Sequence, residues 1–403
     1  MIVTHLAITP LAGSPLRIVN ALRTHANVDA RLIVLNPAAY GNRTFDADLV
    51  WDLKNPALHD RLARSDILHF HHWVDFSHNP FGIDFQQYLR SGAVAIRQFH
   101  THPLTIAQGS SSLAEKIVSD PTPQLVIAQF HERFYPRARL VPNIVPLDDP
   151  LYVPIPRDGT AVTVFFAPSC ATSAWASRWD TKAAPETTLI LRRLQRKLPR
   201  MRVNIIQDTP HRECLRLRQQ ANISIDELAT GSYHLSSLES LAQGIPTLAF
   251  LDQRMLATLA TITGSTDIPW INVTLEMAET ALRQLVSDDQ LRVAVGANSR
   301  KWVELNWTDR VVVSHYTDAY RDVLSNPYSF FEQRFDPSCP TARWFVRDRD
   351  DIAWETRKAH ANRSCVSRLL TGRSMERLAD AVNWIHRKIT AMWFCLSKLR
   401  HSS

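Results

Sequence analysis

The stretch that decides the fold spans residues 230–250 and reads TGSYHLSSLESLAQGIPTLAF. A loop rich in Gly and Ser leads into a short helical segment with one acid, Glu239, and an apolar strand follows Pro246. Backbone N–H groups and the positive end of a helix dipole at such a helix start favour a phosphate or diphosphate. The acid in the helix can accept hydrogen bonds from sugar hydroxyls. The alternative interpretation is an ordinary α/β turn with a surface glutamate.

Around this stretch the chain alternates between apolar, β-rich runs and helical segments. Such alternation predicts βαβ units and parallel sheets. At 403 residues the chain exceeds one typical core, so we expect two domains, with the boundary at a proline-rich spacer, residues 147–159. The strands expected before the spacer are 2–9, 30–35, 66–71, 93–100 and 124–130, and those after it are 162–166, 203–207 and 223–225.

The 230–250 stretch resembles the donor-site motif of GT-B glycosyltransferases, the large retaining group that includes sucrose synthase. In that group two glutamates separated by seven residues precede Ala-x-x-Gly-x-Pro and an apolar strand. The second glutamate falls on Glu239, with Gly244 and Pro246 in place. The resemblance implies an α/β fold of two Rossmann-like domains that face each other across a cleft, with a C-terminal helical extension in this chain.

The domain limits implied by that plan follow the spacer and the motif. Residues 1–150 would form the acceptor domain, 151–306 the nucleotide-sugar donor domain, 307–325 a helix crossing back to the first domain, and 326–403 a basic helical extension. The crossing helix is expected to present an apolar face, and its members at helical spacing are Val311, Val312, His315, Tyr316, Ala319 and Val323.

Two positions depart from the family pattern. The first glutamate of the motif falls on Gly231, which has no side chain to contact a sugar, and Asp226 and Glu227 just upstream are candidates to replace it. The family's His-Asp motif falls on His100, which is followed by Thr101 rather than Asp.

The resemblance implies a role for each candidate site residue. His100 and Glu239 are the expected catalytic pair, with His100 against the donor sugar and Glu239 against the ribose. His131 is the candidate on the acceptor side, and the alternative for both histidines is a buried core imidazole. The expected donor-binding residues are Gly13, Arg178, Lys182, Ser236, Ser237 and Glu239.

The implied reaction is transfer of a sugar from a nucleotide sugar, UDP- or GDP-linked, to a hydroxyl of a glycan or lipid-linked glycan, with retention. No metal or other cofactor is expected, because the resemblance implies none and the clustered histidines lack His-x-x-x-His spacing. By analogy the context is bacterial surface polysaccharide synthesis. A non-catalytic GT-B protein and a sugar-nucleotide epimerase are the rival hypotheses, and the lack of Gly-x-Gly-x-x-Gly disfavours a dehydrogenase.

The charge of the chain is concentrated at its end. The whole chain carries +7, and from Thr356 onward ten basic residues face only Glu376 and Asp380. Apolar residues at 3–4 spacing there predict a basic amphipathic helix that contacts an anionic membrane, packs on the body or self-associates. No nucleic-acid motif accompanies the charge, so nucleic acid is not an expected partner. Five scattered cysteines favour a reducing compartment, and we expect a cytoplasmic protein at the inner face of the membrane.

Overall fold

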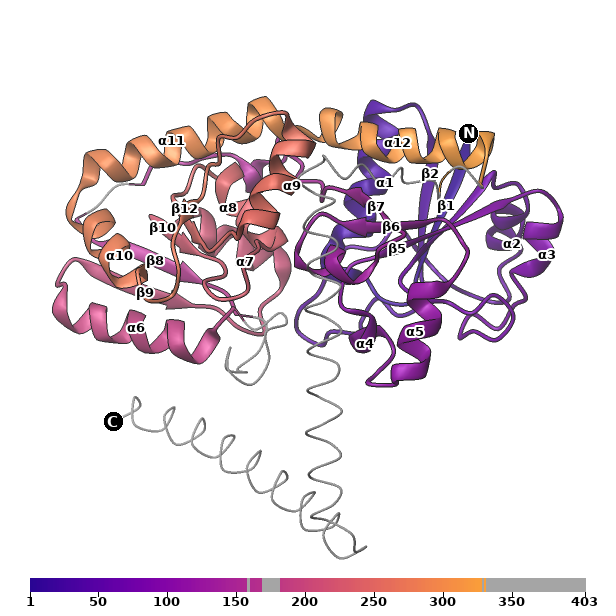
Figure 1. Ribbon diagram of the computed structural model, residues 1–403, viewed down its shortest axis with the longest axis horizontal. Coiled ribbons are helices and arrows are strands. Elements are labelled where there is room, and N and C mark those ends of the chain that lie inside the picture. The colour runs from indigo at the N-terminus through magenta and orange to yellow at the C-terminus, as the bar shows by residue number, and fades with distance from the viewer. Residues whose placement is uncertain (158–159, 169–181, 328–329, 331–403) are drawn as a thin grey trace, which may run out of the picture. The chain divides into compact units, whose positions relative to one another are not determined.

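The computed structural model describes residues 1–157, 160–168, 182–327 and 330, and all of them belong to one compact unit. These residues form two parallel sheets with helices packed around them (Figure 1). Within this part of the chain, no helix has both the length and the apolar character that crossing a membrane requires.

The first sheet has seven strands in the order β3-β2-β1-β4-β5-β6-β7, and every neighbouring pair is parallel. The strand order reverses between β1 and β4, and the carboxyl ends of strands at such a reversal form the usual ligand crevice of an open α/β sheet. The strands are β1 (Ile2–Ala7), β2 (Asp29–Val34), β3 (Leu49–Val50), β4 (Ile67–His71), β5 (Val94–Phe99), β6 (Gln124–Ile127) and β7 (Arg139–Val141).

Three of the helices around the first sheet, α2 (Pro56–Ala63), α4 (Pro103–Ile106) and α5 (Ser111–Ser119), start at a residue whose side chain caps the helix. Asn55 accepts a hydrogen bond from the N–H of Ala57 at 3.0 Å, and Pro56 takes the first helical position, where its missing N–H costs nothing. The other helices of this half are α1 (Ser14–His25) and α3 (Gln86–Arg90), with 3₁₀ turns η1 (Leu11–Gly13), η2 (Phe130–Phe134) and η3 (Pro150–Tyr152).

The second sheet has five parallel strands in the order β12-β11-β10-β8-β9. They are β8 (Val162–Phe166), β9 (Met201–Ile205), β10 (Ile223–Ile225), β11 (Thr247–Ala249) and β12 (Ile271–Asn272). The helices around them are α6 (Ala184–Lys197), α7 (His211–Gln219), α8 (Leu235–Ala242), α9 (Gln253–Thr263), α10 (Ala278–Ser287) and α11 (Asp289–Asn306).

The turn that ends α8 fits closely against α11. Gly244 has a φ of +66°, which allows the sharp turn into β11. A Cβ on Gly296 of α11 would lie 2.5 Å from the carbonyl oxygen of Gly244. Only glycine at 296 therefore lets α11 pack on the helix that carries Glu239.

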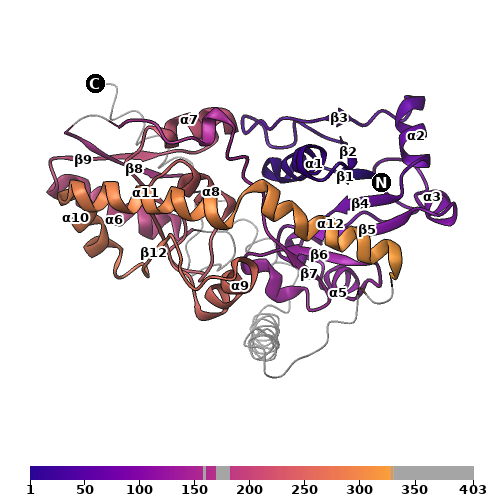
Figure 2. The same ribbon diagram turned by 90° about the horizontal axis from the view of Figure 1, so that it is seen from above.

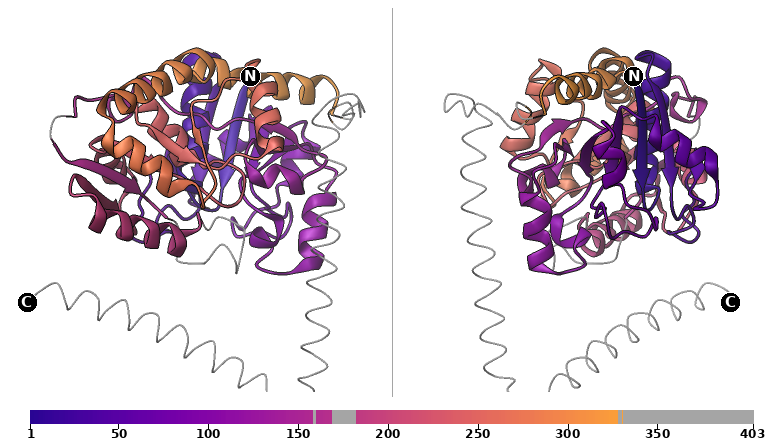
Figure 3. Two further views of the ribbon diagram at one scale, coloured as in Figure 1. Left: turned by 60° about the vertical axis from the view of Figure 1, so that its left-hand side comes forward. Right: turned by 90° about the vertical axis from the view of Figure 1, so that its right-hand side faces the viewer.

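Helix α12 (Asp309–Ser325) follows α11 and packs on the first sheet, with its Tyr316 hydroxyl donating to the carbonyl of Pro142 at 3.0 Å. Figures 2 and 3 show α11 and α12 following one another along one side of both sheets. The buried face of α12 contains Val312, Tyr316, Ala319 and Val323, as the sequence predicts, together with Val313 and Tyr320. The prediction for Val311 was wrong, because this side chain is 44% exposed.

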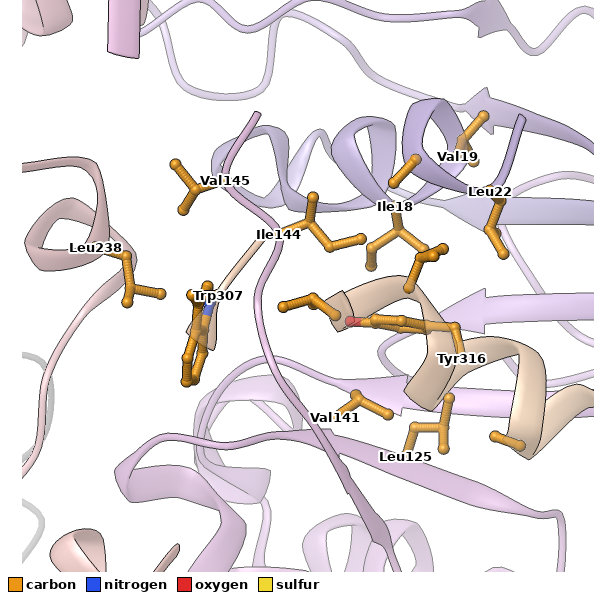
Figure 4. Packing of buried hydrophobic residues seen from close by; sticks show 14 of the residues in the cluster. Ile18, Val19, Leu22, Leu125, Val141, Ile144, Val145, Leu238, Trp307 and Tyr316 are labelled. Atoms are coloured by element: carbon orange, nitrogen blue, oxygen red, sulfur yellow. The ribbon is translucent and has the colours of Figure 1, made fainter. Parts of the chain in front are cut away.

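One hydrophobic cluster joins the two halves. Trp307 is fully buried at the junction of α11 and α12, and its indole N–H donates to the carbonyl of Asn143 at 2.9 Å. Figure 4 shows Trp307 between Leu238 of α8 and the segment that carries Ile144 and Val145. The buried indole therefore ties the second half to the segment that follows β7.

Candidate functional site

A cleft of about 570 Å³ lies between the two sheets. From the first half it is lined by the loop after β1 and by residues that follow β5 and β6. From the second half it is lined by the loop after β9, Lys182 and the first turn of α8. The carboxyl ends of both sheets thus contribute to one cleft, where ligands of open α/β sheets bind.

Lys182 is held in this cleft by two groups of the second half. Its Nζ donates to Asp226 at 2.8 Å and to Ser236 Oγ at 2.7 Å. An ammonium has three N–H donors, and the described residues take two of them. Lys182 and Ala183 both have a left-handed φ, +50° and +44°, just before α6 begins. Strained backbone of this kind persists only where the surroundings hold it, and here it places a buried ammonium at the cleft.

Asp226 is the buried counter-ion of this lysine. It also accepts hydrogen bonds from the backbone N–H of His234 at 2.6 Å and from Ser236 Oγ at 2.9 Å. Burial alone would raise the pKa of Asp226, but the charge of Lys182 and the hydrogen bonds outweigh burial and hold the pKa far below its ordinary value. Asp226 therefore fixes Lys182 rather than contacting a sugar, and it does not line the cleft.

Glu239 lines the cleft at the centre of a charged network. Its Oε1 accepts from Arg17 at 2.6 Å and from His211 at 3.0 Å, and its Oε2 accepts from Arg218 at 2.5 Å. Burial would raise the pKa of Glu239, but the two guanidinium groups reverse that effect and keep it well below the ordinary value. A carboxylate has about four lone-pair sites, and the described residues fill three of them.

Arg17 and Arg218 were missed by the sequence analysis. Arg17 comes from α1 of the first half and Arg218 from α7 of the second, so Glu239 joins the two halves. Neither arginine belongs to a recognisable motif. In the sequence each is an arginine within a predicted helix, as an ordinary surface arginine would be.

Two further ion pairs join the halves on the other side of the cleft. Arg254, just inside α9, forms a bidentate pair with Glu132 of η2, and both side chains are almost fully buried. Arg133 donates to Asp252, the N-cap of α9, at 2.6 Å. Charged side chains therefore hold the described halves together at both edges.

The predicted serine and glycine ligands do not all lie in the cleft. Ser236 lines the cleft and holds Lys182. Ser237 lies one residue further along α8, so its side chain points to another face; it is fully buried and accepts from the indole N–H of Trp270. The prediction that Ser237 offers a donor to the ligand therefore fails, because its hydroxyl is turned into the core. Gly13, with a φ of +76°, ends η1, and its neighbours Leu11, Ala12 and Ser14 line the cleft.

The position of the missing motif acid has a structural explanation. Gly231 has a φ of +84°, and a Cβ there would lie 2.8 Å from Asp252 Oδ2. Glu227, a candidate replacement, is fully buried and accepts from the N–H groups of Ala229 and Thr230. Neither it nor Asp226 lines the cleft.

Both predicted histidines lie in the cleft. His100 follows β5 and His131 belongs to η2, and both line the cavity from the side of the first half. His100 Nε2 lies 2.9 Å from His71 Nδ1, and burial lowers the pKa of His100 well below its ordinary value. His100 is thus a neutral imidazole. Arg178, the other predicted diphosphate ligand, lies outside the described residues.

A loop of the first half, residues 36–48, was not predicted to reach the site. Arg43 and Phe45 of this loop line the cleft, and the Phe45 ring lies 5.2 Å from the ring of His211. Gln207 and Asp208, in the loop after β9, also line the cleft. The sequence of the 36–48 loop is rich in turn residues, which gave no indication of an aromatic wall.

One group of histidines in the described residues has ligand atoms close enough for a metal ion. The nitrogens of His5, His69 and His71 lie within 4.8 Å of one another. Their rings stack, with centroids 4.4 Å apart for His5 and His69 and 4.6 Å for His69 and His71. Imidazole lone pairs lie in the ring plane, so stacked rings do not converge on one ion.

No family model matches the sequence, and no curated protein matches it. Solved structures with similar folds include sucrose-phosphate synthase from Thermosynechococcus elongatus (12% identity, TM-score 0.48, 80% of this chain and 99% of that chain). HepE from Anabaena, solved with UDP-glucose, has 10% identity and a TM-score of 0.49 over 81% of this chain and 100% of that chain. WaaG, a glycosyltransferase involved in lipopolysaccharide biosynthesis, has 12% identity and a TM-score of 0.44 over 81% and 100%.

Because these TM-scores lie below 0.5, we assign the fold from the described residues themselves. Two parallel Rossmann-like sheets share one cleft, and a C-terminal helix returns to the first sheet. The chain has the GT-B fold.

Proposed function

We propose that this protein is a glycosyltransferase that transfers a sugar from a nucleotide sugar to a hydroxyl of a glycan or glycolipid. The observation that carries the proposal is the buried ammonium of Lys182, which lies in the cleft beside Ser236 of α8 and uses two of its three donors among the described residues. In the reaction the bond between the anomeric carbon and the diphosphate oxygen breaks, and its electron pair stays on the diphosphate. The acceptor oxygen bonds the anomeric carbon and its proton is released.

The charges of the cleft suit a diphosphate leaving group. Lys182 and the first N–H groups of α8 would stabilise the negative charge that grows on the diphosphate, and such preorganised electrostatic help is often the largest catalytic contribution. Glu239 would accept from the ribose with its remaining lone pair. His100, on the opposite wall, would contact the donor sugar, and His131 would lie on the acceptor side. The proposed mechanism uses these side chains and no metal ion.

Finer assignments belong to the same proposal. The proposed donor is a UDP- or GDP-sugar, as the family resemblance implies. The proposed product is a bacterial surface polysaccharide, by the same analogy. Retention, a hexose donor, a cytoplasmic location and contact of residues 326–403 with an anionic membrane are parts of the proposal that rest on the sequence.

The test is calorimetric binding of UDP, GDP, ADP and TDP and their common sugar conjugates, with magnesium and then with EDTA. We expect one nucleotide to bind equally well in both conditions. The double variant Lys182→Met/Asp226→Asn, which removes both charges, should weaken that binding at least tenfold. Lys116→Met, at an exposed lysine of α5, is the matched control and should bind as the wild type does. Binding of no nucleotide would reject the proposal.

A non-catalytic nucleotide- or glycan-binding protein is the second candidate. It is favoured by Gly231, where the backbone and Asp252 leave no space for the motif acid. Slow hydrolysis of the bound nucleotide sugar separates the two, because an enzyme of this class releases free sugar and nucleotide when acceptor is absent. Tight binding with no hydrolysis, and no transfer to any glycan, would favour the second candidate.

A further inference from the structure

A line of hydrogen-bonded side chains connects α12 to the cleft through the core of the first half. The Tyr320 hydroxyl lies 3.2 Å from His5 Nε2, and His5 Nδ1 lies 2.9 Å from His71 Nε2. His71 Nδ1 in turn lies 2.9 Å from His100 Nε2, and His100 lines the cleft. The sheet explains this alignment, since β1 and β4 are adjacent parallel strands and His100 directly follows β5.

Each imidazole in this line carries one proton. Burial lowers the pKa of His5, His71 and His100 well below the ordinary value, and the neighbouring histidines lower it further. A neutral imidazole has one N–H donor and one acceptor nitrogen. In a line of such rings every hydrogen bond must therefore run in the same direction, and one fixed end sets the direction of all the others.

The fixed end is a backbone carbonyl, which can only accept. The Tyr316 hydroxyl gives its one proton to the carbonyl of Pro142 at 3.0 Å. Its oxygen must then accept from the amide nitrogen of Gln98, which lies 3.3 Å away. This arrangement orients the Gln98 amide, whose oxygen is buried and has no other partner in the described part of the chain.

The Gln98 side chain shares a face of the sheet with His69, because it lies two residues beyond Ile96, the partner of His69 on β5. His69 Nε2 and the Gln98 oxygen are both buried, and neither has a hydrogen-bond partner among the described residues. Burial lowers the pKa of His69 to about 3, and the Gln98 side chain acts in the opposite direction, as an acceptor facing the ring would. His69 therefore carries its proton on Nε2, and its Nδ1 accepts from the Tyr320 hydroxyl at 2.7 Å.

The proton on His69 Nε2 then sets the donor and the acceptor in each hydrogen bond between Tyr320 and the cleft. The Tyr320 oxygen accepts from His5, His5 accepts from His71, and His71 accepts from Nε2–H of His100. We propose that this line of hydrogen-bonded side chains, which we call the relay, holds His100 in the Nε2–H tautomer. The lone pair of Nδ1 is then available in the cleft, and His100 accepts a hydrogen bond there from a hydroxyl of its ligand. Tyr320, His5 and His71 are then positioning residues. That the hydroxyl belongs to the donor sugar rests on the proposed function.

The first experiment reads the tautomer directly. Nitrogen-15 shifts of the full-length protein, labelled at histidine and free of ligand, distinguish protonated from unprotonated ring nitrogens, and the His100 signals are assigned by their loss in His100→Gln. We expect Nε2 to be protonated and Nδ1 to be unprotonated. A protonated Nδ1 would overturn the relay, and so would stoichiometric zinc in the purified protein, because a metal-bound nitrogen cannot donate.

The second experiment breaks the relay at a distance from the cleft. Tyr320→Phe removes the hydroxyl that links His69 to His5, so both tautomers of His100 become allowed and its two nitrogen shifts should move toward each other. The matched control is Tyr233→Phe, which removes a buried hydroxyl that has no partner among the described residues. Unchanged His100 shifts in Tyr320→Phe would overturn the relay, whereas unchanged shifts in the control are expected.

A binding measurement separates this inference from the proposed function. In Tyr320→Phe the dissociation constant of the nucleotide sugar should rise several-fold, while that of the free nucleotide should stay the same, because His100 contacts only the sugar. An equal change in both constants would contradict the role of His100. If no nucleotide binds even to the wild type, the proposed function fails while the nitrogen shifts still test the relay.

Discussion

The two walls of the cleft are held by buried polar networks of opposite character. On the wall of the first half the network is neutral, with imidazoles and tyrosines in a directional line. On the wall of the second half it is ionic, with Lys182–Asp226 and Glu239 between arginines. A neutral network fixes the direction of hydrogen bonds, whereas an ionic network fixes the positions of charges. One cleft thus combines a wall suited to hydroxyl groups with a wall suited to phosphates.

The largest expected difference between the networks is their response to acid. His5, His69 and His71 have lowered pKa values when folded but titrate near 6.5 when unfolded. Their contribution is fully present above pH 6.5 and is lost as pH falls toward the folded pKa, about 3 for His69. Within this window, each of the three histidines lowers the free energy of unfolding by about 1.4 kcal/mol for every unit by which the pH falls.

Urea unfolding between pH 7.5 and 5 measures this loss. The ionic network behaves differently, because Glu239 and Asp226 lose their contribution only below their unfolded pKa values, near 4.5 and 3.8. His78→Gln, at a histidine whose side chain is 96% exposed, should leave the slope unchanged. A free energy of unfolding that stays constant from pH 7.5 to 5 would show that the imidazoles are not buried and neutral.

The next largest effect is expected in the ionic network. Lys182→Met leaves the buried carboxylate of Asp226 without its counter-ion and should cost about 3–5 kcal/mol of unfolding free energy. Adding Asp226→Asn should restore most of that loss, because an amide can accept from the N–H of His234 and donate to Ser236. Urea unfolding of the two variants at pH 7.5 is the measurement, and equal losses in both would show that the charge is not the cause.

A smaller effect is expected where the ionic wall departs from the family motif. Gly231→Ala should cost about 1–2 kcal/mol for its positive φ, and about 1 kcal/mol more because Asp252 must move and its N-cap contact weakens. Gly264→Ala is the matched control, with a φ of +69° and no atom within 4 Å of the added Cβ. Its thermal unfolding should show the φ cost alone. If the two variants have the same melting temperature, Asp252 does not exclude a side chain at 231.

The smallest effect compares two buried tyrosines. Tyr320→Phe should cost about 1–3 kcal/mol, because it leaves the polar nitrogens of His5 and His69 unpaired. Tyr233→Phe should be neutral or up to about 1 kcal/mol more stable, since its hydroxyl is buried without a partner in the described part of the chain. Urea unfolding of both variants under the same conditions checks the difference, and a larger loss for Tyr233→Phe would contradict the assignment of partners.

The sequence predicts the long strands well because they are apolar and almost completely buried, as β1 and β4 are. It does not predict β3, β7 or β12, which have two or three residues each, although it does predict the equally short β10. The family resemblance led to Lys182, Ser236 and Glu239, which all lie in the cleft. Their functions stay predictions.

What the sequence could not supply are the partners of these residues. Arg17 and Arg218 lie 222 and 21 positions from Glu239, so their convergence depends on tertiary structure. The relay has the same origin, because the hydrogen bond between His5 and Tyr320 spans 315 positions. Ser237 was misplaced for a local reason, since adjacent residues of a helix face different directions.

The ion pair between Glu132 and Arg254 restricts which substitutions these two positions can accept during evolution. Both side chains are almost fully buried, and they come from different halves. A substitution of either one alone would strand a buried charge at a cost of several kcal/mol. In an alignment of relatives that retain this junction, positions 132 and 254 should therefore vary together, as a pair of opposite charges or as a pair of uncharged residues, although 122 positions separate them.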